Sequence, residues 1–186
     1  MNVQKLIQTV AYILYRNDGC MDYYNLIKEC YIADRMSIEA TGRAITGDSY
    51  VSMARGPVLK GLYTFIKLKC DNPELQSLWN ECFSVDENHK ISIIKQDISS
   101  DYLSRYEEDV LNQVCQRFYK YSYSDMKSYA HTQGVFPEWE SVEKGKEKPI
   151  ELQTIMRAVN IPDNEIKILI DEQNSFENEA ALFHSN

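Results

Sequence analysis

A glycine-rich segment, ITGDSYVSMARGPV at residues 45–58, holds the residue types that first point to chemistry in this chain. Glycine turns at a helix start bind phosphate, because exposed N–H groups and the helix dipole favour anions. A phosphate-binding loop needs the pattern G-x-x-x-x-G-K-[ST] after a strand. Here Gly47 and Gly56 are nine residues apart, no Lys-Ser or Lys-Thr pair follows, and a helical pattern precedes the segment. We therefore do not expect a nucleotide site in this segment.

Other catalytic and metal-binding patterns are missing from the sequence. It has no G-x-S-x-G nucleophile turn, and its five cysteines include no C-x-x-C pair. None of the three histidines stands at metal-ligand spacing to a cysteine. We expect no enzymatic activity, no metal and no cofactor, and we expect the cysteines to be reduced thiols.

One carboxylate, Asp34, falls on the apolar side of its predicted helix, four residues after Cys30. A carboxylate that faces a core is costly unless it is paired and hydrogen-bonded. We hypothesise that Asp34 receives hydrogen bonds from the 43–56 segment and holds that segment against the helix. The basic candidates nearby are Arg35, Arg43 and Arg55. The alternative is a helix rotated so that Asp34 reaches water.

Hydrophobic periodicity and capping residues predict the elements that position this segment. In the first half of the chain, we expect a helix at 3–16 after the cap Asn2, one at 22–41 before Gly42, one that opens at Gly56-Pro57, and a short one capped by Asp71-Asn72-Pro73. In the second half, we expect a helix capped by Ser99 or Ser100, one from Ser124 to about Gly134, one introduced by Pro149, and one from Asp163. Between them, CFSVDENHKISII changes period and predicts a hairpin within 82–95. The expected fold class is mainly α (α+β), a compact single-domain helical fold with a small antiparallel β-hairpin over residues 1–174. Residues 175–186 are expected to form a polar tail that frays.

Composition and charge narrow the class of protein. The chain has 186 residues, of which 44% are hydrophobic and 26% charged, as in a globular domain. Residues 1–70 carry 9 basic and 6 acidic side chains (net +3), and residues 71–186 carry 11 and 22 (net −11). The acidic part disfavours non-specific DNA binding and suits either solubility or a basic protein partner. Because no apolar run of about 18 residues exists, we expect a cytoplasmic protein with no membrane span and no direct nucleic-acid binding.

Two motifs resemble the SocA-type antitoxin domain family, also called the Panacea domain. The first is YIADR followed by GRAITGDSYVSMARGPVLKGLY, and the second is YSDMKSYAHTQGVFPEWE. The family pattern has a helix ending in an Asp-Arg-like motif, then Gly-Arg-Pro-Ile-Thr-Gly, an aromatic-rich turn and Gly-Pro-Val. Its second motif has a Ser/Thr-His pair ending a short helix, followed by Pro-Trp. The resemblance spans about residues 5–160, and this chain departs from it at Ala44, where the family has Pro, and at Glu138, which separates Pro137 from Trp139.

The resemblance implies an antitoxin that neutralises a toxin encoded beside it through direct protein contact. It further implies a prophage or mobile-element setting and no enzymatic activity, and the SocA member is associated with delivering its toxin to a protease. Because the chain starts directly with the first domain helix, we expect no separate DNA-binding module. The alternative is a phage or prophage regulator that binds a host protein and has no partner toxin.

The motif residues serve either as scaffold or as partner contacts, and the resemblance leaves both open. They are Asp34, Arg35, Gly42, Arg43, Thr46, Gly47, Asp48, Tyr50, Arg55, Gly56, Pro57, His131, Pro137 and Trp139. A motif common to domains that serve different toxins favours the scaffold. His131 is either a contact or charge switch, or a hydrogen-bonded link between its short helix and FPEWE.

Partner specificity is expected elsewhere in the chain. We place it in the hairpin (82–95), the 135–149 loop and the acidic C-terminal region. The tyrosine cluster is either an interface anchor or core packing with hydroxyls at the edge, and its members are Tyr119, Tyr121, Tyr123 and Tyr129.

Overall fold

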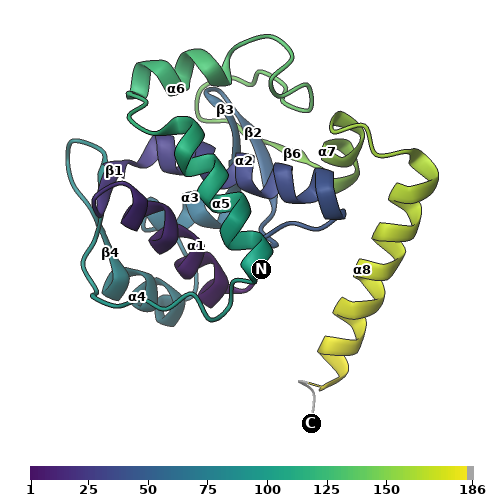
Figure 1. Ribbon diagram of the computed structural model, residues 1–186, viewed down its shortest axis with the longest axis horizontal. Coiled ribbons are helices and arrows are strands. Elements are labelled where there is room, and N and C mark those ends of the chain that lie inside the picture. Colours follow the sequence, from purple (N-terminus) through teal and green to yellow (C-terminus); the bar gives the residue numbers. More distant parts are fainter. Residues whose placement is uncertain (184–186) are drawn as a thin grey trace.

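Helices dominate the structure, a computed structural model that describes residues 1–183, except the side chains of residues 174 and 176–183. The helices are α1 (Val3–Arg16), α2 (Tyr23–Thr41), α3 (Lys60–Ile66), α4 (Pro73–Cys82), α5 (Arg105–Phe118), α6 (Tyr123–Ala130), α7 (Leu152–Ala158) and α8 (Asp163–Phe183). The strands are β1 (Cys20–Asp22), β2 (Tyr50–Met53), β3 (Gly56–Leu59), β4 (Phe83–Val85), β5 (Lys90–Ile93) and β6 (Lys148–Ile150). The predicted mainly α (α+β) class is confirmed (Figure 1).

Helix α2 lies at the centre of the fold and contacts α1, α3, α5, α6, α7, β1 and β3 (Figure 1). Asp22 caps its start by accepting the Tyr24 N–H, and Gly42 ends it with a φ of 71°, as the sequence predicts. Asn2 caps α1 in the same way by accepting the Lys5 N–H. The glycine-rich segment therefore leaves from the end of a helix that neighbours hold on several sides.

Two small antiparallel sheets accompany the helices. In the first, with the strand order β1-β5-β4, strands β4 and β5 form the hairpin predicted within 82–95. Strand β1 adds a third strand to it, pairing Met21 with Ile91. The second sheet has the order β3-β2-β6, and its central strand belongs to the glycine-rich segment.

The prediction of helix starts at two prolines is wrong. Pro57 lies in β3 opposite Ser52, and Pro149 lies in β6 opposite Val51. Both strands are edges of the second sheet, where a residue without an N–H is tolerated. The fixed φ of proline suits the first turn of a helix and an edge strand alike, and α3 and α7 begin only after these strands.

Two helix starts also differ from the prediction. Helix α5 is capped by Ser104 and not by Ser99 or Ser100, and α6 begins at Tyr123 after the cap Ser122 and not at Ser124. In both helices, the side chain of an acidic residue three positions after the cap accepts a hydrogen bond from the backbone N–H of the cap residue. The capping-box spacing was the stronger sequence signal at each start, because it satisfies two helix-end groups at once.

An aromatic stack from α3, α4 and β4 forms part of the core. Trp79 is 1% exposed, and its ring lies 5.4 Å from that of Phe65 and 4.5 Å from that of Phe83, measured between centroids. Asn72 caps α4 with a proline in the first turn, as predicted.

The cysteines of the described residues are free thiols. Cys30, Cys82 and Cys115 are buried. Their burial is typical of cysteines that act as small apolar residues.

Helix α8 stands at one side of the molecule, away from α1 and α4 (Figure 1). It begins at Asp163, as predicted, and contacts α7. Its backbone is helical to Phe183. The prediction of a polar tail over 175–186 falls largely on side chains and residues outside the described part, so it stays a prediction. Among the residues that the structure describes, no helix combines the length and apolarity that a membrane span requires.

Candidate functional site

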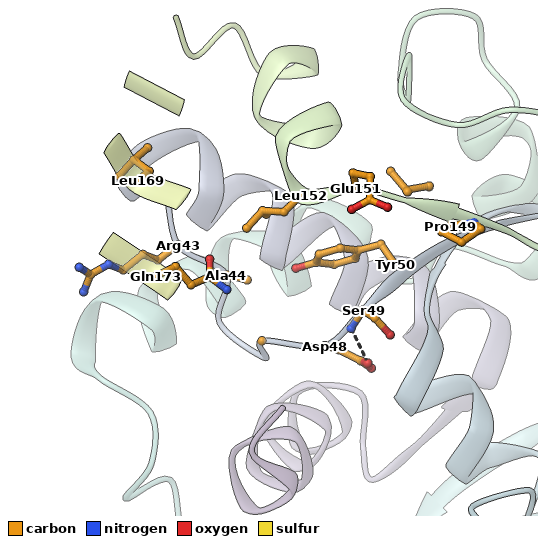
Figure 2. Close-up of a pocket in the computed structure, with 12 residues that line it drawn as sticks. Arg43, Ala44, Asp48, Ser49, Tyr50, Pro149, Glu151, Leu152, Leu169 and Gln173 are labelled. Carbon is orange, nitrogen blue, oxygen red and sulfur yellow. Dashed lines mark hydrogen bonds between the residues drawn. The ribbon is translucent and has the colours of Figure 1, made fainter. Parts of the chain in front are cut away.

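The glycine-rich connection between α2 and β2 forms one wall of a surface cavity of about 480 Å³. Figure 2 shows Leu169 and Gln173 of α8 at one end of this cavity and Pro149 at the other. At the α8 end, a Cβ atom on Gly42 would lie 2.5 Å from Leu169 Cδ1. Gly42 also has a positive φ, so backbone conformation and packing both select glycine there. Arg43 reaches α8 across the rim, with 3.6 Å between its Nη2 and Glu172 Oε2.

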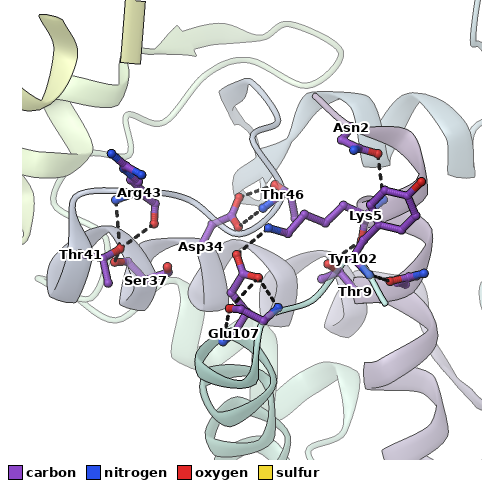
Figure 3. Close-up of polar contacts among 12 residues, drawn as sticks. Asn2, Lys5, Thr9, Asp34, Ser37, Thr41, Arg43, Thr46, Tyr102 and Glu107 are labelled. Atoms are coloured by element: carbon purple, nitrogen blue, oxygen red, sulfur yellow. Dashed lines mark hydrogen bonds and ion pairs between the residues drawn. The ribbon is translucent and has the colours of Figure 1, made fainter. Parts of the chain in front are cut away.

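Asp34 is fully buried and accepts three hydrogen bonds, two from Thr46 of the connection (Figure 3) and one from Tyr50 of β2. The backbone N–H of Thr46 donates over 2.9 Å, its hydroxyl over 2.5 Å, and the Tyr50 hydroxyl over 2.9 Å. The hypothesis that Asp34 holds the 43–56 segment against the helix is confirmed, and the alternative of a solvated Asp34 is wrong. Its donors are one amide and two hydroxyls, while Arg35 and Arg43 pair with glutamates.

Burial and hydrogen bonding act in opposite directions on Asp34. Burial raises the pKa of its carboxyl from 3.8 to about 6, and the donors from Thr46 and Tyr50 lower it. The pKa of Tyr50 is raised well above its usual value, first by burial and then by the negative charge of Asp34. The hydrogen bond from Tyr50 to Asp34 persists through neutral pH because the Tyr50 hydroxyl stays protonated.

Asp48, which lies in the connection itself, is a second buried carboxylate, and it caps α3 from outside that helix. It accepts the N–H groups of Ser49 (2.7 Å), Gly61 (2.9 Å) and Leu62 (2.9 Å). Residue Leu59, at the N-cap position of α3, has no side-chain hydrogen bond to the helix start. Burial raises the pKa of Asp48, and its three N–H donors oppose that shift. Asp48 thus supplies the acceptor that the local sequence of α3 lacks.

Glu138 joins the second motif to α2, and sequence reasoning missed this residue. Its Oε1 accepts the Tyr31 hydroxyl over 2.8 Å and the Arg35 Nε–H over 2.9 Å, while its side chain is fully buried. In the sequence, Glu138 was only the residue that separates Pro137 from Trp139. The available signal was an acidic residue in the apolar stretch from Phe136 to Trp139, since a buried carboxylate needs hydrogen-bond or charged partners.

Trp139 links the same segment to the second sheet. Its indole Nε1–H donates to the Met53 carbonyl over 2.9 Å. The next residue, Glu140, donates its backbone N–H to the Ser52 hydroxyl over 3.1 Å. Although Glu138 separates Pro137 from Trp139, the Trp139 side chain still bonds to β2, the strand that belongs to the first motif.

His131 follows the last residue of α6, which ends at Ala130 and not near Gly134 as predicted. The imidazole is exposed and contacts Trp139 edge-on, with 5.2 Å between ring centroids. Burial lowers the pKa of His131, and the charges of Lys127 and Lys28 lower it further. The link from the short helix to FPEWE exists, and it is a ring contact.

The remaining motif residues divide by exposure. Arg43, Gly47, Arg55, His131 and Pro137 are exposed. Gly56 and Pro57 are buried, and the Pro57 carbonyl accepts the Nζ of buried Lys28 over 2.6 Å. Sequence reasoning did not single out Lys28, whose only signal was its place four positions from Tyr24 and from Ile32 on α2.

The tyrosine cluster divides in the same way. Tyr119 and Tyr121 are exposed, at 54% and 39%. Tyr123 and Tyr129 are half-buried and pack edge-on against Tyr24 and Phe118. Core packing therefore describes Tyr123 and Tyr129, and the role of Tyr119 and Tyr121 as interface anchors stays a prediction.

The fold and site define a class: a mainly helical α+β domain in which buried carboxylates tie a glycine-rich hairpin to a central helix. Comparison with protein families matches residues 26–140 to the Antitoxin SocA-like, Panacea domain. The match covers more than half of the chain, and the protein belongs to this family. Comparisons with curated proteins and with solved structures gave no match. Among the described residues, no group of three or more His, Cys, Asp or Glu side chains is placed to hold a metal ion.

Proposed function

We propose that this protein neutralises a cognate protein toxin by binding it directly in the cytoplasm. The observation that carries the proposal is membership of the SocA-like antitoxin domain family. The proposed activity is binding without catalysis. In support, the two buried carboxylates of the motif are occupied by donors from the chain itself.

We infer that the buried motif residues are scaffold. Asp34, Thr46 and Tyr50 bond to one another, and Asp48 bonds to the start of α3. Such groups are shielded from a partner, and their loss would change the fold before it changed an interface. A partner reaches only the exposed motif residues, which are Arg43, Gly47, Arg55, His131 and Pro137.

We place toxin contact on three segments. These are the exposed turn of the β4–β5 hairpin at 86–90, the largely exposed loop at 140–148 before β6, and the acidic α8, of which residues 163–173 are largely exposed. Residues beyond 140 lie outside the family match. Exposed Tyr119 and Tyr121 add amphipathic rings of the kind that anchor interfaces.

Co-expression with the adjacent gene tests the proposed function. The neighbour and this protein are induced separately, and growth is read together with affinity co-purification. Growth arrest by the neighbour, relieved by this protein with co-purification of the two, is the expected result. A harmless neighbour and no co-purification would overturn the proposal and favour the alternative of a regulator that binds a host protein.

Surface variants test where the toxin binds. Deletion of residues 175–186 and charge reversal of the residues 143–148 are each expected to weaken neutralisation. Asp97→Lys with Asp101→Lys, both exposed and outside the three segments, is the matched control. If both surface variants neutralise like the unmodified protein, the proposed interface is wrong.

Delivery to a protease is a separate step of the proposal. It predicts that the toxin's half-life in cells shortens when this protein is co-expressed. A toxin that is neutralised with an unchanged half-life would leave binding alone as the mode of action.

A further inference from the structure

A second cavity, of about 300 Å³, lies between the start of α2, the β2–β3 turn and the turn at 144–146. Three tyrosine rings, those of Tyr23, Tyr24 and Tyr63, line it together with aliphatic side chains. Its size is at the lower end of the range for small-ligand sites, which are mostly apolar with a few placed polar groups. The cavity is separate from the one beneath α8, since the two share no lining residue.

The charged residues that line this cavity all carry one sign. They are Lys28, Arg55, Lys144 and Lys146, and the lining residues of the described part include no Asp or Glu. Of these four cations, only Lys146 forms an ion pair with a carboxylate of the described residues, Glu143 at 2.7 Å, and both of these side chains are largely exposed. A cluster of cations in a chain with a net charge of −8 marks the cavity as an exception to the overall charge.

Lys28 brings a buried amine to this cavity. The residue is 1% exposed, its Nζ donates to the Pro57 carbonyl over 2.6 Å, and the Tyr24 ring centroid lies 5.2 Å from it. No Asp or Glu in the described part of the chain forms an ion pair with it. An ammonium group has three donors, and a buried charge is costly without a counter-charge.

The β2–β3 turn is shaped around this amine. A Cβ atom on Gly56 would lie 2.9 Å from Lys28 Nζ, and Gly56 has a φ of 103°. Any side chain at this position would displace the amine or strain the turn. Gly56 therefore lets the backbone pass directly over Lys28 at the wall of the cavity.

We propose that this cavity is a binding site for a carboxylate carried on a compact apolar or aromatic group. The carboxylate pairs with the Lys28 amine, Arg55 and Lys144 approach it from the rim, and the tyrosine rings pack against the apolar part. A free aromatic acid and the C-terminal residue of a peptide both have this chemistry.

The effect of burial on Lys28 agrees with this assignment. Burial lowers the pKa of the amine from 10.5 to about 7. A bound carboxylate stabilises the ammonium form, so binding takes up a proton near neutral pH. The other charged or titratable groups that line the cavity are Tyr23, Tyr24, Tyr63, Arg55, Lys144 and Lys146, and the charge of Lys28 also acts on His131.

Calorimetric titration of the full-length protein with N-acetyl-L-phenylalanine tests the site, with its uncharged carboxamide as the matched ligand. We expect saturable binding of the acid that is at least about tenfold tighter than binding of the amide. Equal affinity for acid and amide, or no binding of the acid, overturns the proposal. Because no toxin is present, this outcome is independent of the neutralisation experiment.

Variants locate the binding. Lys28→Met keeps an apolar stem and is expected to remove the preference for the acid and the proton uptake. Arg55→Gln with Lys144→Gln changes only exposed side chains, so it tests the site even if the Lys28 variant misfolds. It should weaken acid binding by about fivefold, whereas Lys69→Gln with Lys95→Gln, exposed and away from the cavity, should not. Unchanged acid binding in the Arg55 and Lys144 variant would overturn the assignment.

A peptide pair distinguishes the two sources of the carboxylate. Acetyl-Ala-Ala-Ala-Phe with a free C-terminus is compared with the same peptide amidated. Binding of the free-ended peptide at least as tight as that of the small acid assigns the site to a chain terminus. Binding of the small acid alone assigns it to a free acid.

Discussion

Helix α2 buries two carboxyl groups and one amine, and each of the three meets the interior in a different way. Asp34 accepts three hydrogen bonds. Lys28 donates to a carbonyl. Glu29 is 2% exposed, and its Oε2 has no hydrogen-bond partner in the described part of the chain. Since an unsatisfied buried polar atom is costly, we expect Asp34 to stabilise the fold and Glu29 to weaken it.

Asp34→Ala is predicted to lower the free energy of unfolding by about 3 kcal/mol, because it leaves three buried donors without their acceptor. Urea denaturation at pH 7.5 measures the change. Glu39→Ala, an exposed position on the same helix, is the control and should change stability by less than about 0.5 kcal/mol. An equal effect of both substitutions would contradict the bracing role of Asp34.

Glu29→Gln is predicted to make stability less sensitive to pH. Burial raises the pKa of Glu29 from 4.5 to about 8 in the folded state. Between these values the folded state holds a proton that the unfolded state has released, so rising pH destabilises the fold. The variant lacks this group, and its stability relative to the unmodified protein should increase by at least about 1 kcal/mol from pH 5 to pH 8. Urea midpoints across that range measure it, and parallel pH profiles of the two proteins would refute the prediction.

Among the elements, helix α3 depends most clearly on residues outside itself. Its first N–H groups are satisfied by Asp48, which lies in the preceding connection and not at the N-cap. Gly61 permits this approach, because a Cβ atom there would lie 2.8 Å from Asp48 Oδ1 and 2.7 Å from Met1 Sδ. The connection and the helix therefore form one hydrogen-bonded unit.

Gly61→Ala is predicted to destabilise the protein by about 1–2 kcal/mol, although alanine is the better helix former. The added methyl group would force the Asp48 carboxylate away from its N–H donors. Thermal and urea unfolding measure the effect. Ser77→Ala, at an exposed position of α4, is the control and should be neutral or slightly stabilising. A gain in stability for Gly61→Ala would show that Asp48 is not held as described.

Across the whole molecule, α2 connects parts that are distant in the sequence. It contacts α1 and β1 on the side of the first sheet, and β3, α6 and α7 on the side of the second. The two tryptophans report on these sides, because Trp79 packs between α3 and β4 while Trp139 bonds to the end of β2. We therefore predict that both sides unfold together as one cooperative domain.

Two single-tryptophan variants check this cooperativity. Trp139→Phe leaves Trp79 as the reporter, and Trp79→Phe leaves Trp139. In each variant, the urea midpoint from fluorescence should agree with that from far-ultraviolet circular dichroism within about 0.3 M. Any loss of stability from the substitution shifts the urea midpoints from both probes equally. A larger disagreement in either variant would mean that the two sides unfold separately.

Local patterns in the sequence predicted the elements whose causes are local. The caps at Asn2, Asp22 and Asn72 and the glycine after α2 were predicted correctly, because each depends on residues within one helical turn. The 82–95 hairpin follows from a change of period within a few residues. The donors to Asp34 were also within reach of inference, since Thr46 and Tyr50 follow it by only 12 and 16 positions.

The sequence by itself thus determined the helical class, the family and the need of Asp34 for partners. Only the tertiary structure decided that Pro57 and Pro149 flank one central strand, because either proline suits a helix start equally well. It also decided that Glu138 meets Arg35 across 103 positions and that Lys28 lies beneath Gly56. These contacts depend on how distant segments pack together, and no spacing along the chain encodes that packing.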